Sequence, residues 1–480
     1  MATVLFDSLK AWWPEVILSA GAMAAIIAGA WTRRAQPALG LAWATVLAAA
    51  AALLRAPVPA PTDVFFGLIV CDPFSLAFRW IALGVTALVV LISGASSRDV
   101  EPGRRGEYFG LVLLIGVGLM LMAEANHLLM AYVALELVSL NSYLLVGFVH
   151  DQRSAEAGLK YLLIGALSSG LMLFGMSLLF GLTGELSFPG LLAAARGMAD
   201  APPAALSISV ALMFAGLAFK VSMVPFHLWT PDAYEGAPLP IAALLSVGPK
   251  AAGLALLLRV VAVLDPVWHV CAPWVWGLTI ITMTLGNVVA LVQTNIKRLL
   301  AYSTIGQVGY LLIGVTVAGP TAQDALVVYL VAYLFMNLGL FACAQAVVEE
   351  TGSESLEAFA GLGRRSPGLA LLCALFLLSL AGLPPLLGFF GKFLLFGAAV
   401  KAGQAGLAIA GIANSAIALY YYVNILRLMY VAPAPQGRPV RLTRSLRLAA
   451  VLCALATVGL GLAPGWLLQA VSASRAMNLL

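Results

Sequence analysis

The sequence predicts an all-α, polytopic membrane protein with about fourteen transmembrane helices. Of its 480 residues, 62% are hydrophobic and only 10% are charged, and the mean hydropathy is +1.00. A soluble chain of this length would need far more polar surface. Apolar runs of about 18 or more residues recur along the whole length, as membrane-spanning helices require. We therefore expect a single membrane domain.

A window of about 20 residues, the length that crosses a bilayer, locates the individual spans. They lie at residues 12–30, 37–54, 74–95, 108–123, 127–149, 157–182, 205–226, 239–263, 267–292, 299–318, 322–348, 367–400, 404–430 and 446–471. Within the domain of residues 1–480 we expect three N-terminal helices (1–100), two five-helix repeats (107–263 and 265–430), and a C-terminal loop with the last helix (431–480).

Spans 7 and 12 are expected to be broken. The stretch FKVSMVPFHLWTPDAYEGAPLPIAALLSVGPK, residues 219–250, carries five prolines, and FLLSLAGLPPLLGFFGKFLLF in span 12 carries Pro384 and Pro385. Proline removes a backbone donor and interrupts a helix, which is tolerated at membrane depth only beside protein or water. Each broken span is the fourth of five, in spans 4–8 and 9–13. Because five is odd, the second set is predicted to be inverted relative to the first, as in many transporters.

The charges of the loops predict the orientation. Loops after odd-numbered spans hold fifteen Lys and Arg residues, and the opposite side holds six. By the positive-inside rule the fifteen face the cytoplasm, so both termini are expected outside it. The net charge of +5 follows from this topology, and a nucleic-acid partner is not expected.

Fifteen and six of the 26 basic residues are assigned to the two sides of the membrane, some of them at span ends, and five remain inside spans: Arg79, Lys160, Lys220, Lys250 and Lys392. A charge in hydrocarbon is costly, about 2.5–3.5 kcal/mol for lysine at a helix centre, and usually marks a functional site. Arg79 is expected to snorkel to the interface. Lys160, near the cytoplasmic start of span 6, is either an interfacial anchor or part of the site. The other three are predicted at graded depths: Lys220 toward the cytoplasm, Lys250 near the middle and Lys392 in the outer half.

A carboxylate and a histidine accompany these lysines. Glu136 lies deep in the apolar run LLMAYVALELVSLNSYLLVGF and needs a cation or a proton. We expect it to pair with Lys220, which belongs to the same five-span repeat. His227 either caps a broken helix end or joins the site. The tyrosines of ALYYYVNILRLMYV, Tyr420 to Tyr422 and Tyr430, are interpreted as an interfacial belt and packing surface.

The cysteines and histidines give no pattern typical of a cofactor site. The five cysteines are scattered singly with no CxxC spacing, and the four histidines are dispersed. Iron–sulfur, zinc and haem sites are therefore not expected in this chain.

Five segments carry a resemblance to a known family: FKVSMVPFHLWTPDAYEGAP, ALELVSLNSYLLVGF, KYLLIGALSSGLMLFG, QTNIKRLLAYSTIGQVGY and PPLLGFFGKF. They resemble the antiporter-like membrane subunits of the proton-pumping NADH:quinone oxidoreductase, respiratory complex I, over spans 4 to 13. The chain lacks the long lateral helix of the sibling subunit L. Lys392 stands where subunit M has a glutamate, so the resemblance is closest to the third, smaller sibling.

The resemblance implies a proton relay made of Glu136, Lys220, Lys250 and Lys392, with Lys160 and His227 as auxiliary groups. It also implies that flavin, iron–sulfur clusters and quinone lie in partner subunits, that the neighbours are other membrane subunits and lipid, and that the membrane is the bacterial plasma membrane. Span 10 offers Ser303 and Gln307 but no glutamate, and span 13 has Asn414 but no lysine, so the second repeat departs from the first.

Two alternatives of different class stay open. One is a subunit of an Mrp-type cation/proton antiporter or of a membrane-bound hydrogenase, which share the lysine and proline motifs, although ALSSG and PDAYEGAP favour the respiratory subunit. The other is a structural scaffold in which the buried charges only fix helix register.

Overall fold

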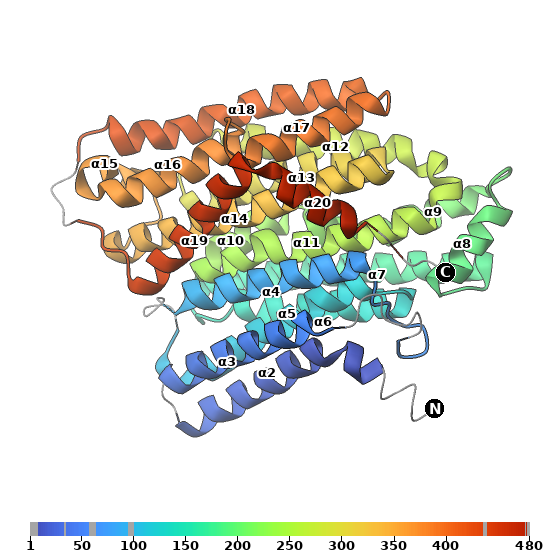
Figure 1. Cartoon of the computed structure of the whole chain (residues 1–480), viewed down its shortest axis with the longest axis horizontal. Coiled ribbons are helices and arrows are strands. Elements are labelled where there is room, and N and C mark those ends of the chain that lie inside the picture. Colours follow the sequence, from blue (N-terminus) through green and yellow to red (C-terminus); the bar gives the residue numbers. More distant parts are fainter. Residues whose placement is uncertain are drawn as a thin grey trace.

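The structure is a computed structural model that describes residues 8–32, 35–56, 64–94, 100–434, 439–475 and 477. Every regular element in these ranges is a helix, and the long helices run along one axis of a single bundle (Figure 1). The first described helix begins, and the last one ends, at the same end of the bundle. The predicted all-α membrane architecture is confirmed.

The helices follow the order expected from the sequence. The N-terminal part contains α2 (Trp13–Thr32), α3 (Ala35–Leu54) and α4 (Pro73–Ser93). The first group of five spans contains α5 (Arg105–Glu124), α6 (Leu128–Val146), α7 (Gln152–Thr183), the pair α9 (Ala204–Val221) and α10 (Trp229–Gly236), and α11 (Leu239–Val263), with α8 (Phe188–Gly197) in a connection. The second group contains α12 (Trp268–Ala290), α13 (Ile296–Val317), α14 (Pro320–Thr351), the pair α16 (Pro367–Ala381) and α17 (Leu387–Lys401), and α18 (Ala405–Tyr430), with α15 (Leu362–Arg365) in a connection. The chain closes with α19 (Arg444–Leu462) and α20 (Pro464–Ala473).

Thirteen of the described helices are long and apolar enough to cross a membrane. The halves α16 and α17 have 15 residues each and together form the predicted twelfth span, so the sequence count of fourteen is recovered. The last predicted span is shorter than expected: α19 ends at Leu462, and α20 is a separate helix of 10 residues that begins at Pro464. Proline has no amide hydrogen, so it interrupts a continuing helix, and it is favoured at the first position of a new one.

Both predicted breaks are present and share their local geometry. In the first, α9 ends at Val221, and Ser222 is left-handed with φ 66°; in the second, α16 ends at Ala381, and Gly382 has φ 91°. A cis X–Pro bond follows in each case, Val224–Pro225 and Pro384–Pro385. Each five-span group therefore has three continuous helices, a broken fourth and a continuous fifth.

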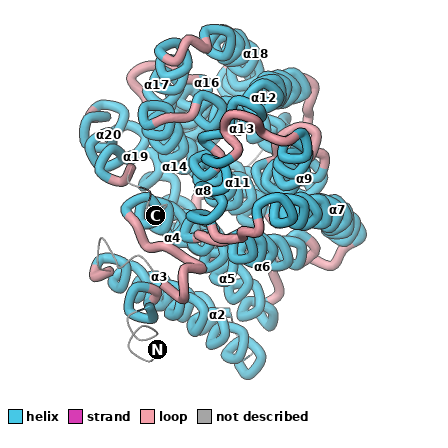
Figure 2. The backbone as a smooth tube through the Cα atoms, turned by 90° about the vertical axis from the view of Figure 1, so that its right-hand side faces the viewer, coloured by secondary structure: helices cyan, strands magenta, loops and turns pink. Residues whose placement is uncertain are grey.

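Helix α11 occupies the centre of the bundle, with α5 to α7 on one side and α13 and α14 on the other (Figure 2). All of its residues except Ala262 are buried, so the helix has no lipid-facing side. Close approach between helices depends on glycine in places: a Cβ at Gly286 of α12 would lie 2.3 Å from the backbone nitrogen of Gly306 on α13. Small residues at such crossings are typical of membrane helix packing.

Candidate functional site

Lys220 lies in the last turn of α9, and its side chain is completely buried. Its Nζ donates a hydrogen bond of 2.7 Å to Oγ of Ser139 on α6. Ser139 in turn donates to the Leu135 carbonyl oxygen, one turn back. The stem of Lys220 packs against α11, where a Cβ at Gly253 would lie 3.4 Å from Lys220 Cγ. The lysine therefore sits where α6, α9 and α11 meet.

Glu136 lies on α6 one turn before Ser139, but it faces outward. Its side chain is only half-buried and lies on the stripe of α6 that carries the exposed residues Val133 and Leu140. Its Oε1 accepts a hydrogen bond from the Ser169 hydroxyl of α7. The expected direct ion pair with Lys220 is not formed in the described part of the chain, because each charged group bonds to a serine instead. Glu136 lies near the middle of α6, in keeping with its place in the apolar run, but its side chain is less buried than we expected.

Lys250 lies near the middle of α11 and is completely buried. No described group accepts a hydrogen bond from its Nζ. The nitrogen instead lies 4.6 Å from the centre of the Trp229 ring and 5.6 Å from that of Tyr234, both on α10. Trp229 is fixed by stacking on Tyr161 at 4.1 Å and by a 3.1 Å hydrogen bond to the Phe219 carbonyl oxygen. The ammonium is thus stabilised by aromatic faces from the segment after the first break.

Lys392 lies on α17 just after the second break. Its Nζ donates to the carbonyl oxygens of Leu380 at 3.0 Å and Ala381 at 3.3 Å, the last two residues of α16. The ring centre of Tyr310 is 4.6 Å away. A positive charge at a helix C-terminus interacts favourably with the unpaired carbonyls there. Gly382 leaves room for the lysine stem, since a Cβ at that position would lie 3.1 Å from Lys392 Cδ.

A polar stripe on α14 connects the surroundings of these two lysines. Tyr329, Tyr333 and Asn337 recur every four residues and so share one helix face, and all three are buried. Asn337 Nδ2 donates a 2.6 Å hydrogen bond to Oγ of Ser246, which lies on α11 one turn before Lys250. The sequence interpretation missed this stripe, although three polar residues at helical spacing in an apolar run could have revealed it.

The other end of the stripe reaches Lys392. The Tyr329 hydroxyl donates to Oε1 of Gln307 on α13. Nε2 of Gln307 lies 3.4 Å from the Leu380 carbonyl oxygen, the same atom that accepts from Lys392. Hydroxyl and amide groups therefore occupy the space between Lys250 and Lys392.

The tyrosine-rich segment of α18 also contributes, since two of its four tyrosines pack inside the bundle. Tyr421 is 2% exposed and Tyr422 is fully buried, whereas Tyr420 and Tyr430 are exposed. The Tyr422 hydroxyl lies 2.6 Å from Ser303 Oγ and accepts from Gln307 Nε2 at 3.1 Å. Helical spacing separates the two faces: the buried pair shares the face of Asn414, seven and eight residues earlier.

The two residues implied as auxiliary are placed differently. Lys160 on α7 is half-exposed and forms ion pairs with Glu156 at 2.8 Å and Asp232 at 3.2 Å. It is therefore not among the buried lysines Lys220, Lys250 and Lys392. His227, between α9 and α10, is 7% exposed, and its Nδ1 has no hydrogen-bond partner among the described residues. The structure buries the side chain of His227 and leaves that of Lys160 half-exposed.

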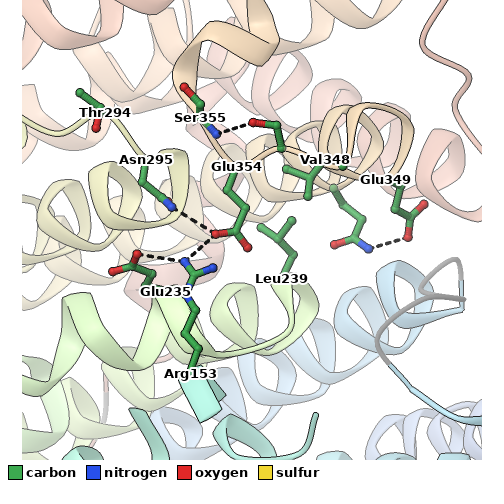
Figure 3. Close-up of a pocket in the computed structure, with 12 residues that line it drawn as sticks. Arg153, Glu235, Leu239, Thr294, Asn295, Val348, Glu349, Glu354 and Ser355 are labelled. Carbon is green, nitrogen blue, oxygen red and sulfur yellow. Dashed lines mark hydrogen bonds and ion pairs between the residues drawn. The ribbon is translucent and has the colours of Figure 1, made fainter. Parts of the chain in front are cut away.

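A polar pocket of about 700 Å³ opens at the end of the bundle where α11 begins and α14 ends. Arg153 reaches between two carboxylates there, Glu235 at 2.9 Å and Glu354 at 2.7 Å (Figure 3). Glu354 also pairs with Lys297 at 2.6 Å and accepts from Asn295 Nδ2 at 3.1 Å. Burial alone would raise the pKa of Glu354, but the Lys297 charge and these hydrogen bonds outweigh it and hold the pKa below its usual value.

The pocket wall continues toward the buried polar stripe. Gln345 of α14 lines the pocket two turns beyond Asn337, and Leu239 lines it at the first residue of α11. Among the described residues, no group of three or more His, Cys, Asp or Glu side chains could hold a metal ion.

Comparison with known proteins gives consistent relatives. The family described as "NADH:quinone oxidoreductase/Mrp antiporter, TM" matches residues 125–418. NADH-quinone oxidoreductase subunit N of Anaeromyxobacter sp. (strain Fw109-5) is 43% identical over 465 residues, covering 89% of this chain and 89% of that relative. Subunit N 2 of Sorangium cellulosum (strain So ce56) is 42% identical over 483 residues, covering 95% and 94%.

Two solved structures show the same fold. A chain of respiratory complex I from Thermus thermophilus superposes with a TM-score of 0.80 at 32% identity, covering 96% of this chain and 99% of that one. A chain of the Mrp complex from Dietzia sp. DQ12-45-1b gives a TM-score of 0.84 at 22% identity, covering 98% and 97%. At that identity the second likeness shows the fold alone.

Proposed function

Because the chain belongs to the family of antiporter-like membrane subunits of NADH-quinone oxidoreductase, with subunit N proteins among its relatives, we propose that it relays protons across the membrane within such an enzyme. The relay groups are Glu136, Lys220, Lys250 and Lys392. The chain contributes no redox step of its own, and the reduction of quinone in partner subunits drives the protons.

The observation that carries the proposal is Lys250. It is a lysine with no exposed surface, at the centre of the bundle, and none of the described residues accepts a hydrogen bond from its nitrogen, which lies over aromatic faces instead. A structural cation in the core would be expected to have a carboxylate or several carbonyls, since an uncompensated buried charge costs several kcal/mol. A lysine that must both hold and release a proton is better served by weak partners.

The proposed route uses the groups between the charged residues. The stripe of Tyr329, Tyr333 and Asn337 on α14, together with Ser246 and Gln307, offers hydroxyl and amide groups between Lys250 and Lys392. Hydrogen-bonding side chains of this kind can be bridged by water where gaps remain. The polar pocket lined by Gln345 is the proposed cytoplasmic mouth, in keeping with the basic loops of that end.

The wider setting is part of the same proposal. We expect the chain to lie in a bacterial plasma membrane with both termini outside the cytoplasm, in contact with sibling antiporter-like subunits and lipid. Flavin, iron–sulfur clusters and quinone are assigned to partner subunits. The division into a three-helix N-terminal part, two repeats and a C-terminal helix stays a prediction.

The test compares Lys220→Met with Lys220→Arg in the assembled, membrane-embedded enzyme. Lys220→Met should suppress proton translocation into vesicles and slow quinone reduction, while electron transfer to artificial acceptors continues. Arginine keeps the positive charge but does not deprotonate in proteins, so Lys220→Arg should also fail to pump. The matched control is Lys401→Met, which removes an exposed lysine at the end of α17. Full pumping by the arginine variant would leave only a structural role for this charge.

A further inference from the structure

A second buried cluster of charges lies far from the polar pocket. It consists of Glu15 on α2, Asp72 before α4, Arg79 on α4, Glu124 at the end of α5 and Arg259 on α11, and none is more than 2% exposed. Arg259 is twenty residues further along α11 than Leu239 of the pocket, about 30 Å at the helical rise. The cluster therefore occupies the opposite end of the bundle. It is separate from the lysine row, which consists of Lys220, Lys250 and Lys392.

Arg79 is the centre of one half of the cluster, so the expectation that it snorkels to the interface was wrong. Its Nε and Nη2 donate to the two carboxylate oxygens of Glu15 at 2.8 and 2.7 Å, and Nη2 also donates to the Ala11 carbonyl oxygen at 3.1 Å. Its Nε lies 3.0 Å from Glu124 Oε1 as well. Two carboxyl groups thus face one guanidinium, which explains why Arg79 is held inside.

Arg259 forms the other half. Its Nη2 donates to Asp72 Oδ1 at 2.8 Å, and its Nε donates to the Ala123 carbonyl oxygen at 2.7 Å. The same Asp72 oxygen accepts from the Ser75 backbone amide at 2.7 Å, as the N-cap of α4. Asp72 therefore has both a cation and a helix N-terminus to stabilise its ionised form.

The charges of the cluster do not balance. Among the described residues of the cluster, three carboxyl groups face two guanidinium groups, and arginine does not lose its proton in proteins. If all three carboxyls were ionised, one negative charge would stay uncompensated in a region without access to water, which is strongly unfavourable. One bound proton makes the cluster neutral.

Glu124 is the carboxyl with the weakest compensation. Its Oε1 shares Arg79 Nε with Glu15 and has a Cys71 thiol at 3.9 Å, while its Oε2 is buried without a partner in the described structure. Nη1 of Arg259 is also buried, and no described residue accepts a hydrogen bond from it. Within the described ranges, the charged and titratable groups that face Glu124 are those of the cluster and Cys71: Glu15 from α2, Cys71, Asp72 and Arg79 from α4 and the segment before it, and Arg259 from α11.

We propose that this cluster is a proton-binding site, separate from the lysine row, and that its single proton resides on Glu124. The proton is bound because the cluster is neutral only with it. Whether the proton is bound should therefore depend on how many carboxyl groups the cluster contains. Removing either Glu124 or Glu15 as an acid leaves two carboxyls for two arginines, and neither variant then needs the proton. The inference does not depend on proton pumping by the lysine row.

The test is infrared spectroscopy of the assembled complex in lipid nanodiscs, comparing the parent with Glu124→Gln and Glu15→Gln. The parent-minus-Glu124→Gln spectrum should contain one carbonyl stretch of a protonated carboxylic acid that shifts in heavy water. The parent-minus-Glu15→Gln spectrum should contain the same band, because Glu124 ionises when Glu15 is neutral. A difference spectrum for Glu124→Gln with carboxylate bands only would overturn the proposal.

Thermal stability provides an independent readout. Glutamine mimics a protonated glutamate, so Glu124→Gln should assemble and unfold at the temperature of the parent. The double variant Glu124→Gln, Glu15→Gln leaves an excess positive charge and should lose more stability than the two single variants together. Failure of Glu124→Gln to assemble, or simple additivity in the double variant, would contradict the charge balance. Glu124→Asp keeps a carboxyl and should retain the protonated band at an altered frequency.

Discussion

Glu354 connects the two five-span groups at the rim of the polar pocket through its ion pairs, and we expect these pairs to stabilise the fold. It is one-fifth exposed, and it pairs with Lys297 of α13, which is 7% exposed, and with the half-exposed Arg153 of α7. Exposed ion pairs contribute less than about 1 kcal/mol and broken buried pairs cost about 3–5 kcal/mol. A partly buried carboxylate with one buried partner lies between these limits. We expect Glu354→Gln to cost about 2 kcal/mol of folding stability.

The measurement is the thermal unfolding midpoint of the purified complex at pH 7, with Glu357→Gln as the control. Glu357 lies in the same segment, is exposed and forms no ion pair in the described structure. The glutamine at position 354 keeps the Asn295 contact and the packing, so a loss of stability isolates the charge. Equal midpoints for Glu354→Gln and the parent would refute the structural role assigned to this network.

The same network predicts a pH dependence of known sign. The pKa of folded Glu354 lies below its usual value, so the native state binds this proton less readily than the unfolded state does. The stabilisation is fully present above the unfolded pKa of about 4.3 and is lost as the pH falls through the lower, folded pKa. The difference in midpoint between the parent and Glu354→Gln should be constant from pH 7 to about pH 5 and shrink under more acidic conditions.

Three further outcomes are expected. Tyr422→Phe removes the hydroxyl that bonds to Gln307 and should slow proton translocation into vesicles with little effect on assembly, at a cost of about 1 kcal/mol; unaltered pumping would exclude this hydroxyl from the route. Gly286→Ala forces a methyl group against the backbone of Gly306, so it should cost about 1–3 kcal/mol of folding stability and lower the thermal midpoint. Gly277→Ala, where a Cβ meets open space, is its control. A cysteine at Arg441 should react with impermeant maleimide only from the cytoplasmic side, and labelling from outside would reverse the proposed orientation.

The number and order of the helices were readable from the sequence because hydropathy and proline act locally. Spans, breaks and the positions of Lys220, Lys250 and Lys392 along their helices follow from run length and from the helix-breaking effect of proline. The direction in which a side chain points depends on which helices are neighbours. For this reason the sequence did not reveal that Glu136 faces outward or that Arg79 is held by two carboxyls from other helices.

The outward position of Glu136 has a consequence for purification. In the isolated chain its half-exposed carboxyl lies among Leu129, Val133 and Leu140, so a detergent micelle or bilayer would press hydrocarbon against it. A protein neighbour could offer polar groups that acyl chains lack, and the carboxyl would then experience different surroundings before and after assembly. Extraction of the single chain thus changes the surroundings of one proposed relay group without altering any covalent bond. Activity assays of this chain should therefore begin with native membranes. Neighbouring subunits can then be removed one at a time, and each removal should be treated as a change in the surroundings of Glu136.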